Sequence, residues 1–385
     1  MYRLYVFDLS YFSGKMEGYL RYKGVPFTRL EPSWGELRRV IYPNTGWMKL
    51  PVIQTPDGRW LQDSTPMIRW FEAEHPEVPV VPADPVHAFL SDLLEDYADE
   101  WLWRPALYYR WAFAKDRALY RRRFVEDFLY DFPLPNPLTG LIATIRQDWT
   151  YLRGDGITRH TRAHVESIYL DTLSRLQAIL SSSPFLLGGR ATVADFGFFA
   201  SMFRHFSLDP TPSRLMRERA PAVYEWVARL WNADGAKLAD APLSAAPGEV
   251  PPGWGPLLED VGRSYLPYLT ANAAAWRDGG QRFDFEVGGV TYRRLPAVQY
   301  RAWCREQLQA RFRSLDADTQ AKLQAILEAH GAWAPLWAEG VIPSGYDVQA
   351  EVPAERRPVQ LTALARLRGF LFGTGWNRGS GVRPE

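Results

Sequence analysis

The side chains of this sequence that could do chemistry include hydroxyl and carboxyl groups at the starts of predicted helices. Ser10 lies between a short run of strand-forming residues and a helical pattern, and Asp63-Ser64 precedes a second helical pattern in the same way. A helix start offers free backbone N–H groups and the positive end of the helix dipole, so a hydroxyl there can cap the helix and an anion can bind. Each position is therefore a candidate for a plain helix cap or for a contact to a ligand.

Other kinds of catalytic chemistry find little support in the sequence. His160 and His164 are four residues apart on a predicted helix and could chelate a metal ion, but a solvated helix face explains the pair better. The single cysteine, Cys304, excludes an internal disulfide and a cysteine-based zinc site, and its helical surroundings predict a buried, inert thiol. There is no P-loop, no G-x-G-x-x-G after a strand and no G-x-S-x-G. We expect no metal cofactor.

The composition is that of a folded protein without an electrostatic bias. The chain has 385 residues, which suggests two or three domains, and 45 basic against 44 acidic side chains give a net charge of +1. Phosphate binding needs a clustered basic excess, so nothing here indicates a nucleic acid partner. The first residues do not resemble a signal peptide, and no run of eighteen apolar residues could span a membrane. We therefore expect a cytoplasmic protein with no membrane partner.

The first region of the chain, residues 1–78, alternates between strand and helix patterns. The order is strand, helix, strand, a loop, then two strands around the turn Pro56-Asp57-Gly58 and a second helix with Ser64 at its cap. A proline-rich connector, "VPVVPADP", then separates this region from the next.

The remainder of the chain is mostly helical and is divided by a second linker. Residues 86–235 have apolar side chains at helical spacing, with Pro105 predicted to kink or break a helix and Thr192–Asp195 fitting a capping box. After the linker "APLSAAPGEVPPGWGP", residues 250–385 read as a hairpin turning at Gly288-Gly289 followed by two helices. We predict three units: 1–78, 86–235 and a small C-terminal extension over 250–385.

Three motifs together resemble the glutathione S-transferase family. They are "LSYFSGKMEGYLRYKGVPF" near the start, "NTGWMKLPVIQTPDGRWLQDSTPMIRWFEAEHP" in the middle of the first region, and "FLLGGRATVADFGFFASM" in the helical region. Each motif alone is weak, but they occur in the family's order and spacing over about residues 1–235. The resemblance implies an α/β thioredoxin-like N-terminal domain, then an all-α glutathione-transferase C-terminal domain, and usually a homodimer. The small, mostly helical extension is additional, because ordinary members end near residue 235.

The resemblance implies that the first strand-to-helix turn activates the thiol of glutathione. A free thiol has a pKa of about 8.5, so catalysis requires a donor that stabilises the thiolate at neutral pH. Ser10 aligns with the position where serine-type members carry the activating hydroxyl and cysteine-type members carry a nucleophile. Tyr11 and Ser13 lie close enough to be the donor instead, and Ser10 could also be only a helix cap.

The resemblance assigns the rest of the tripeptide to two further segments. Leu50-Pro51 resembles the family's cis peptide, where the backbone of Leu50 would pair with the cysteinyl part of glutathione. Asp63 would face the γ-glutamyl ammonium, while Ser64 and its helix start would bind the γ-glutamyl carboxylate. Lys49 could reach the glycyl carboxylate, although a solvated lysine is an equally good interpretation.

The acceptor would lie against the helical half, where the aromatic residues from Trp101 to Trp111 crowd together. Most of these should be core residues, and we expect Tyr108 and Trp111 to face a substrate. The resemblance thus predicts glutathione and a small hydrophobic electrophile as substrates, in a detoxification role. Two alternatives remain: a non-catalytic binding or scaffold protein, and a specialised glutathione-dependent lyase, dehalogenase or isomerase.

Overall fold

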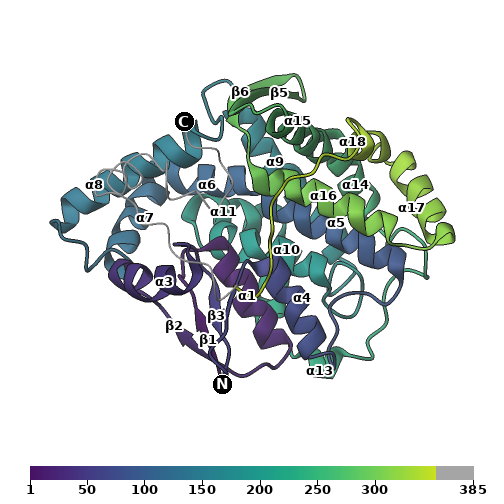
Figure 1. Cartoon of the computed structure of the whole chain (residues 1–385), viewed down its shortest axis with the longest axis horizontal. Helices are drawn as coiled ribbons and strands as arrows, with labels where there is room; N and C mark the ends of the chain where they lie inside the picture. The colour runs from purple at the N-terminus through teal and green to yellow at the C-terminus, as the bar shows by residue number, and fades with distance from the viewer. Residues whose placement is uncertain (353–385) are drawn as a thin grey trace.

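The N-terminal region folds around a four-stranded mixed sheet. The structure is a computed structural model, which describes residues 1–352 (Figure 1). The strand order is β2-β1-β3-β4, with β1 parallel to β2 and antiparallel to β3, and β3 antiparallel to β4. The elements are β1 (Tyr2–Tyr5), α1 (Tyr11–Tyr22), β2 (Phe27–Leu30), α2 (Trp34–Glu36), η1 (Leu37–Ile41), α3 (Tyr42–Thr45), β3 (Val52–Gln54), β4 (Trp60–Gln62) and α4 (Ser64–Glu74). This is the thioredoxin-like arrangement that the resemblance implied.

Local signals explain most of these boundaries. The predicted turn at Pro56-Asp57-Gly58 joins β3 to β4, and Gly58 has a φ of 91°, which favours glycine. The start of α1 fits the capping interpretation of Ser10, whereas the start of α4 differs from the prediction of Ser64 as its cap. Helix α1 begins at Tyr11 with Ser10 as its N-cap, and α4 has Asp63 at its N-cap, so that Ser64 is the first helical residue.

The second region is entirely helical, as predicted. Its elements are α5 (Pro85–Trp101), α6 (Trp103–Ala112), α7 (Ala114–Asp127), α8 (Asn136–Gln147), η2 (Asp148–Arg153), α9 (Arg162–Leu180), α10 (Val193–Ser201), η3 (Met202–Phe206), α11 (Pro210–Arg219), α12 (Pro221–Asn232) and α13 (Gly235–Leu238). The helix breaks at Leu102, three residues before Pro105, because the proline fits only the first turn of a new helix. The capping box of Thr192 and Asp195 is also present at the start of α10.

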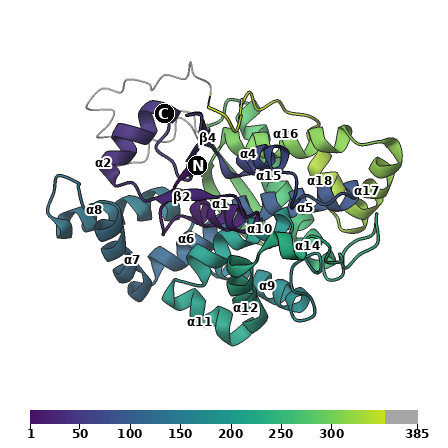
Figure 2. The same cartoon turned by 90° about the horizontal axis from the view of Figure 1, so that it is seen from below.

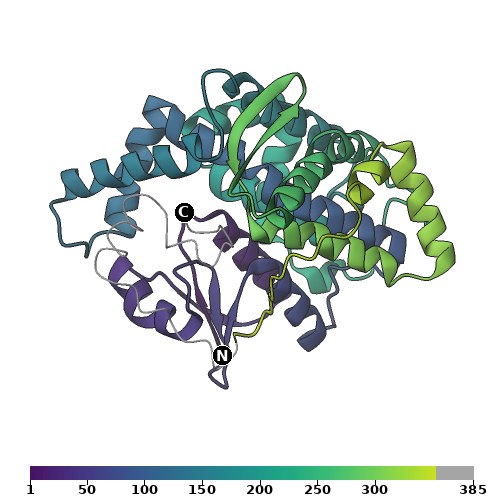
Figure 3. The same cartoon turned by 45° about the horizontal axis from the view of Figure 1, so that its top comes forward.

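The C-terminal extension contains a hairpin and helices that pack along α5. Its described elements are α14 (Gly255–Asp260), η4 (Val261–Tyr265), α15 (Leu266–Arg277), β5 (Arg282–Val287), β6 (Val290–Pro296), α16 (Gln299–Arg313), α17 (Ala317–Ala329) and α18 (Trp333–Trp337). The predicted hairpin and both predicted helices are present, and Asp316 caps α17. Helices α16 and α17 lie beside α5 (Figure 1), and the hairpin stands at the end of the molecule away from the sheet (Figure 3). The part of the predicted extension beyond Val352 lies outside the described residues.

Helix α5 carries an acidic face that other parts of the chain cover. Its carboxylates recur at helical spacing: Asp92, Glu95, Asp96, Asp99 and Glu100. Each has a partner: Lys15 for Glu95 and Asp99, Arg69 and Arg311 for Asp92, Tyr265 for Asp96, and Arg301 for Glu100. Arg301, Arg311 and Tyr265 belong to the extension, so the extension is joined to α5 by polar contacts as well as by packing.

After α18 the chain returns to the sheet. The backbone N–H of Gln62 donates to the carbonyl oxygen of Ala350 at 3.0 Å, and the N–H of Val352 donates to the carbonyl oxygen of Trp60 at 2.8 Å. Glu351 forms an antiparallel bridge with Leu61. The segment reaches β4 from the extension side in Figure 2, so the extension contacts both α5 and the outer edge of β4.

Three findings concern what the sequence predicted about Cys304, about a metal site and about membrane spans. Cys304 is buried in α16, as predicted. His160 precedes α9 rather than sharing the helix with His164, and no group of three potential metal ligands occurs among the described residues. Within residues 1–352, none of the helices has the length and apolar character needed to cross a membrane.

We expect the protein to gain stability as the pH falls from 8 to about 5. Burial raises the pKa of Asp96 to about 7, and burial raises the pKa of Asp63, Asp195 and Asp209 to about 6. An unfolded aspartate has a pKa of about 3.9, so between pH 4 and 7 the folded state binds more protons, and the stability from these groups is lost as the pH rises through 6 to 7. Thermal unfolding at constant ionic strength across this range measures the effect.

Two histidines have the opposite effect on the pH dependence of stability. Burial lowers the pKa of His205 and of His164, so each binds fewer protons in the folded state and favours stability at higher pH. The four aspartates outnumber these two histidines, so the net effect expected is a gain in stability as the pH falls. An Asp96→Asn variant, which cannot titrate, should lose part of the pH dependence between pH 6 and 7. An unchanged slope in that variant would contradict the assignment.

Candidate active site

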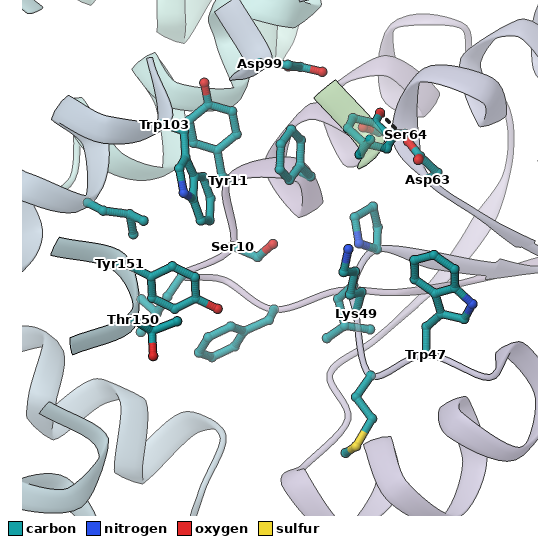
Figure 4. A pocket seen from close by; sticks show the side chains of 18 of the residues that line it. Ser10, Tyr11, Trp47, Lys49, Asp63, Ser64, Asp99, Trp103, Thr150 and Tyr151 are labelled. Carbon is teal, nitrogen blue, oxygen red and sulfur yellow. Dashed lines mark hydrogen bonds between the residues drawn. The ribbon is translucent and has the colours of Figure 1, made fainter. Parts of the chain in front are cut away.

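A cavity of about 520 Å³ lies where the sheet region, the helical region and the extension meet. Its lining includes Ser10 at the start of α1, Lys49 to Pro51 before β3, and Asp63-Ser64 at the start of α4. Figure 4 shows Lys49 on one side of Ser10, and Trp103 and Tyr151 on the other. The structure therefore brings the candidate residues of three separate motifs to one cavity.

Ser10 is half-buried and lies at the middle of this cavity. It caps α1, because its Oγ accepts a hydrogen bond from the backbone N–H of Ser13 at 3.3 Å. That bond uses an acceptor site of the hydroxyl and leaves its proton available for donation. The capping role and a role toward a ligand are thus compatible.

The two alternative donors have other hydrogen-bond partners. Tyr11 is fully buried, and its hydroxyl donates to the carbonyl oxygen of Ala98. Ser13 is also buried, outside the cavity lining, and its Oγ accepts from the backbone N–H of Phe7 at 3.2 Å. In Figure 4 the Tyr11 ring points toward Trp103 and Asp99, away from Lys49.

The segment before β3 presents backbone and one ammonium group to the cavity. The peptide bond between Leu50 and Pro51 is cis. Lys49 is accessible to water but enclosed by the cavity, and this desolvation lowers its pKa despite the attraction of Asp63. The Lys49 Nζ lies 5.0 Å from the ring centroid of Trp47, a cation–π distance.

Asp63 and Ser64 lie across the cavity from Trp103 and Tyr151 (Figure 4). Asp63 has a φ of 70°, an uncommon backbone conformation for a residue other than glycine. Burial raises the pKa of Asp63 to about 6, against the opposing charges of Lys49 and Lys15. Ser64 is buried, and as the first residue of α4 it lies beside the free N–H groups of the first turn.

The far side of the cavity is an aromatic chamber built by α6, α7 and η2. Trp111 lines it, whereas Tyr108 does not, because the Tyr108 hydroxyl instead donates to Glu166 Oε1 at 2.6 Å. The sequence analysis did not single out most of the aromatic lining: Phe7, Phe12, Trp34, Trp103, Phe124, Phe128 and Tyr151. Trp103 belongs to the group of aromatic residues already noted around Trp111. Nothing in the sequence near the phenylalanines indicates that they line a cavity, because a packed core uses the same residues.

The extension also lines the cavity, which the sequence did not predict. Val298, Tyr300 and Arg301 contribute from the start of α16, and Tyr346 to Gln349 contribute from the returning segment. Asp99, whose Oδ1 is buried without a hydrogen-bond partner among the described residues, lies in the same lining.

The sequence matches two family models, described as "Glutathione S-transferase, N-terminal domain" over residues 4–79 and "Glutathione S-transferase, C-terminal domain" over residues 148–234. The chain thus contains matches to both domains of the glutathione S-transferase family. The sheet with α1 and α4 falls within the first match, and η2 to α12 fall within the second. The part of the extension that lines the cavity lies beyond both matches.

Comparison with curated proteins gave no significant match, but many solved structures are similar. A glutathione S-transferase from Rhodospirillum rubrum is 17% identical, with 61% of this chain and 90% of that chain covered and a TM-score of 0.40. The β-etherase LigF from Sphingobium is 17% identical, covering 61% and 97%, with a TM-score of 0.43. A glutathione S-transferase from Methylobacterium radiotolerans, in complex with glutathione sulfonate, is 19% identical, covering 64% and 96%, with a TM-score of 0.37.

Proposed function

We propose that the protein is a glutathione transferase that activates the thiol of glutathione for attack on a small hydrophobic electrophile. The observation that carries the proposal is the single cavity into which Ser10, the cis peptide before Pro51, and Asp63-Ser64 all open, next to an aromatic chamber. The matches to both domains of the glutathione S-transferase family support glutathione as the thiol.

In this proposal the tripeptide extends along the sheet end of the cavity. The Leu50 backbone pairs with the cysteinyl part, Asp63 faces the γ-glutamyl ammonium, and Ser64 with the first turn of α4 holds the γ-glutamyl carboxylate. Lys49 is close enough to this end to attract the glycyl carboxylate. The sulfur then lies beside Ser10 and faces the aromatic chamber.

Ser10 is the thiol-activating donor in this mechanism. Its hydroxyl proton and the N–H groups of the first turn of α1 stabilise the thiolate, and the thiol proton leaves to solvent. The thiolate forms a bond to an electrophilic carbon, from which a leaving group departs with its electron pair. Tyr11 and Ser13 are weaker candidates, because the Tyr11 proton is donated to Ala98 and Ser13 lies outside the cavity lining.

The chamber supports an apolar, aromatic-sized acceptor. Trp103, Trp111 and Tyr151 give it stacking surfaces, while Arg146 and Thr150 add a few polar groups. Tyr108, predicted to face the acceptor, is less suited to that role because its hydroxyl is bound to Glu166. A homodimer and a cytoplasmic location remain part of the proposal, and light scattering and cell fractionation test them.

The test is glutathione binding by calorimetry, followed by turnover with a generic aryl halide. Saturable binding with conjugation supports the transferase. Binding without conjugation of any tested electrophile favours the non-catalytic binding protein, and a specialised lyase, dehalogenase or isomerase would be found by a metabolite screen. Absence of glutathione binding would overturn the proposal.

A further inference from the structure

A tyrosine of the extension contacts the carboxylate at the sheet end of the cavity. Tyr300, on the first turn of α16, lines the cavity, and its hydroxyl donates to Asp63 Oδ1 at 3.3 Å. The dashed line at Asp63 in Figure 4 marks this interaction. Burial and the charge of Asp63 raise the pKa of Tyr300 well above its ordinary value, so the hydroxyl remains a donor. The two residues are 237 positions apart in the chain.

Contacts with two other aromatic rings hold the Tyr300 ring in place. The Tyr300 ring centroid lies 5.2 Å from that of Trp303 and 5.9 Å from that of Tyr346. Tyr346 in turn lies 6.2 Å from Trp47, in the loop before the cis peptide. This cluster connects α16, the returning segment and the segment that carries Lys49 and Leu50, so the hydroxyl is directed at Asp63 by packing rather than by the hydrogen bond alone.

The returning segment is anchored at both ends of the cavity. Near α16, the Ser344 hydroxyl donates to Glu306 Oε2 at 2.6 Å, and its carbonyl oxygen accepts from Trp276 Nε1 and Gln299 Nε2 at 3.0 Å each. At the other end, Ala350 and Val352 make the backbone bonds to β4 described above. Tyr346 to Gln349 therefore lie across the cavity on fixed supports, and the contact of Tyr300 with Asp63 is part of a built structure.

Asp63 needs such support to remain a carboxylate. Its burial favours the neutral form, whereas Lys49, Lys15, the Tyr300 hydroxyl and the backbone N–H of Thr65 favour the charged form. From α5, Glu100 adds negative charge near Tyr300, and Asp99, whose pKa burial raises, faces Tyr300 as well. An anionic Asp63 is required to attract an ammonium group, so each donor on it matters for a cationic ligand.

We propose that Tyr300 is a positioning residue of the tripeptide site, which orients the Asp63 carboxylate and keeps it ionised for the γ-glutamyl ammonium of glutathione. The extension thereby becomes part of the substrate site and contributes to its selectivity for a ligand with an ammonium group at that end. This inference rests on the proposed glutathione binding. It assigns a function to a region that lies outside both family matches.

The chain offers a matched control for this bond. The Tyr265 hydroxyl, also from the extension, donates to Asp96 Oδ2 at 2.7 Å on α5. Neither residue lines the cavity. Tyr265→Phe therefore removes the same kind of hydrogen bond, from a tyrosine of the extension to an aspartate, without touching the ligand site.

The experiment compares glutathione with its deamino analogue, in which a glutaryl group replaces the γ-glutamyl group, in the full-length protein. Tyr300→Phe should raise the Kd for glutathione about 5- to 20-fold, as expected for loss of a hydrogen bond to a charged group. It should change the Kd for the analogue by less than about twofold, because the analogue has no ammonium for Asp63 to attract. The acidic limb of glutathione binding should also move to higher pH. Tyr265→Phe should leave the ratio of the two Kd values and the pH profile unchanged.

Each result distinguishes this proposal from the proposed function. If the wild type fails to bind glutathione, the proposed function falls and the role of Tyr300 falls with it. If the wild type binds glutathione but Tyr300→Phe weakens both ligands equally, or weakens neither, only the positioning role is overturned. A double variant with Asp63→Asn gives a second measure, since removing Tyr300 should have little further effect once Asp63 is neutral.

Discussion

Replacing Ser10 with alanine is expected to lower kcat for conjugation of an aryl halide by about 10- to 100-fold, the range expected when a hydrogen bond to a charged group is lost. The pKa of the bound glutathione thiol should rise by about 1 to 2 units, because each unit corresponds to about 1.4 kcal/mol of thiolate stabilisation. Glutathione affinity should change little, since Lys49, Asp63 and Ser64 still hold the tripeptide. The ultraviolet absorbance of the bound thiolate, followed against pH, measures the shift.

The controls for this prediction are the two neighbouring hydroxyls. Ser13→Ala removes a buried acceptor from Phe7 and should lower stability while leaving the thiol pKa unchanged. Tyr11→Phe should behave similarly, because the Tyr11 proton goes to Ala98. A rise in the thiol pKa with either of these variants, and none with Ser10→Ala, would transfer the donor role to that neighbour.

The capping role of Ser10 has to be separated from its proposed role in catalysis. Loss of a serine N-cap costs about 1 kcal/mol of stability, so Ser10→Ala should lower the melting temperature whether or not Ser10 contacts the sulfur. Assays well below that temperature remove this contribution. Ser10→Asp, which keeps a capping oxygen but has no proton to donate when ionised, should recover stability, and full recovery of kcat as well would indicate that capping alone explains the loss.

Local sequence signals predicted the elements of this fold well. The turn at Gly58, the break before Pro105 and the capping box from Thr192 to Asp195 each depend on residues within a few positions of one another. Such signals decide where an element begins or ends. They contain no information about which surface the element packs against, which is why the hairpin and helices of the extension were predicted but their position was not.

The acidic face of α5 illustrates the limit most clearly. Carboxylates at helical spacing ordinarily indicate a solvated face. In this protein the face is covered, because Lys15 of α1 and Arg301 and Arg311 of the extension supply the opposing charges. Each partner is far away in the sequence, and no periodicity could connect it to α5.

The candidate site shows the same division. Ser10, Pro51 and Asp63-Ser64 lie in motifs that a family resemblance can align, and all of them line one cavity. Tyr108 was expected at the acceptor side because it belongs to the crowd of aromatic residues from Trp101 to Trp111, but its hydroxyl donates to Glu166 outside the cavity. This hydrogen bond of the Tyr108 hydroxyl can be seen only in the folded chain.

Replacing Lys15 with methionine is expected to destabilise the protein by about 3 to 5 kcal/mol, the cost of leaving a buried charge without its partner. Lys15 is fully buried between Glu95 and Asp99, and it joins α1 of the sheet region to α5 of the helical region. Burial opposes ionisation of Glu95, but Lys15 outweighs it and lowers the pKa of Glu95, whereas burial raises the pKa of Asp99 well above its ordinary value. Urea unfolding measures the loss.

The charges carried by the buried cluster of Lys15, Glu95 and Asp99 determine which second substitution should restore stability. Because the pKa of Glu95 is lowered and that of Asp99 is raised, we expect Glu95 to carry the charge that balances Lys15. Lys15→Met with Glu95→Gln should therefore recover most of the lost stability, and Lys15→Met with Asp99→Asn should recover less. Arg214→Met, which removes an exposed ion pair to Glu218, should cost only about 0 to 1 kcal/mol. Equal recovery by both double variants would mean that Glu95 and Asp99 share the negative charge. A loss below about 1 kcal/mol for Lys15→Met alone would mean that water reaches these three side chains and that the packing of α1 on α5 does not depend on this ion pair.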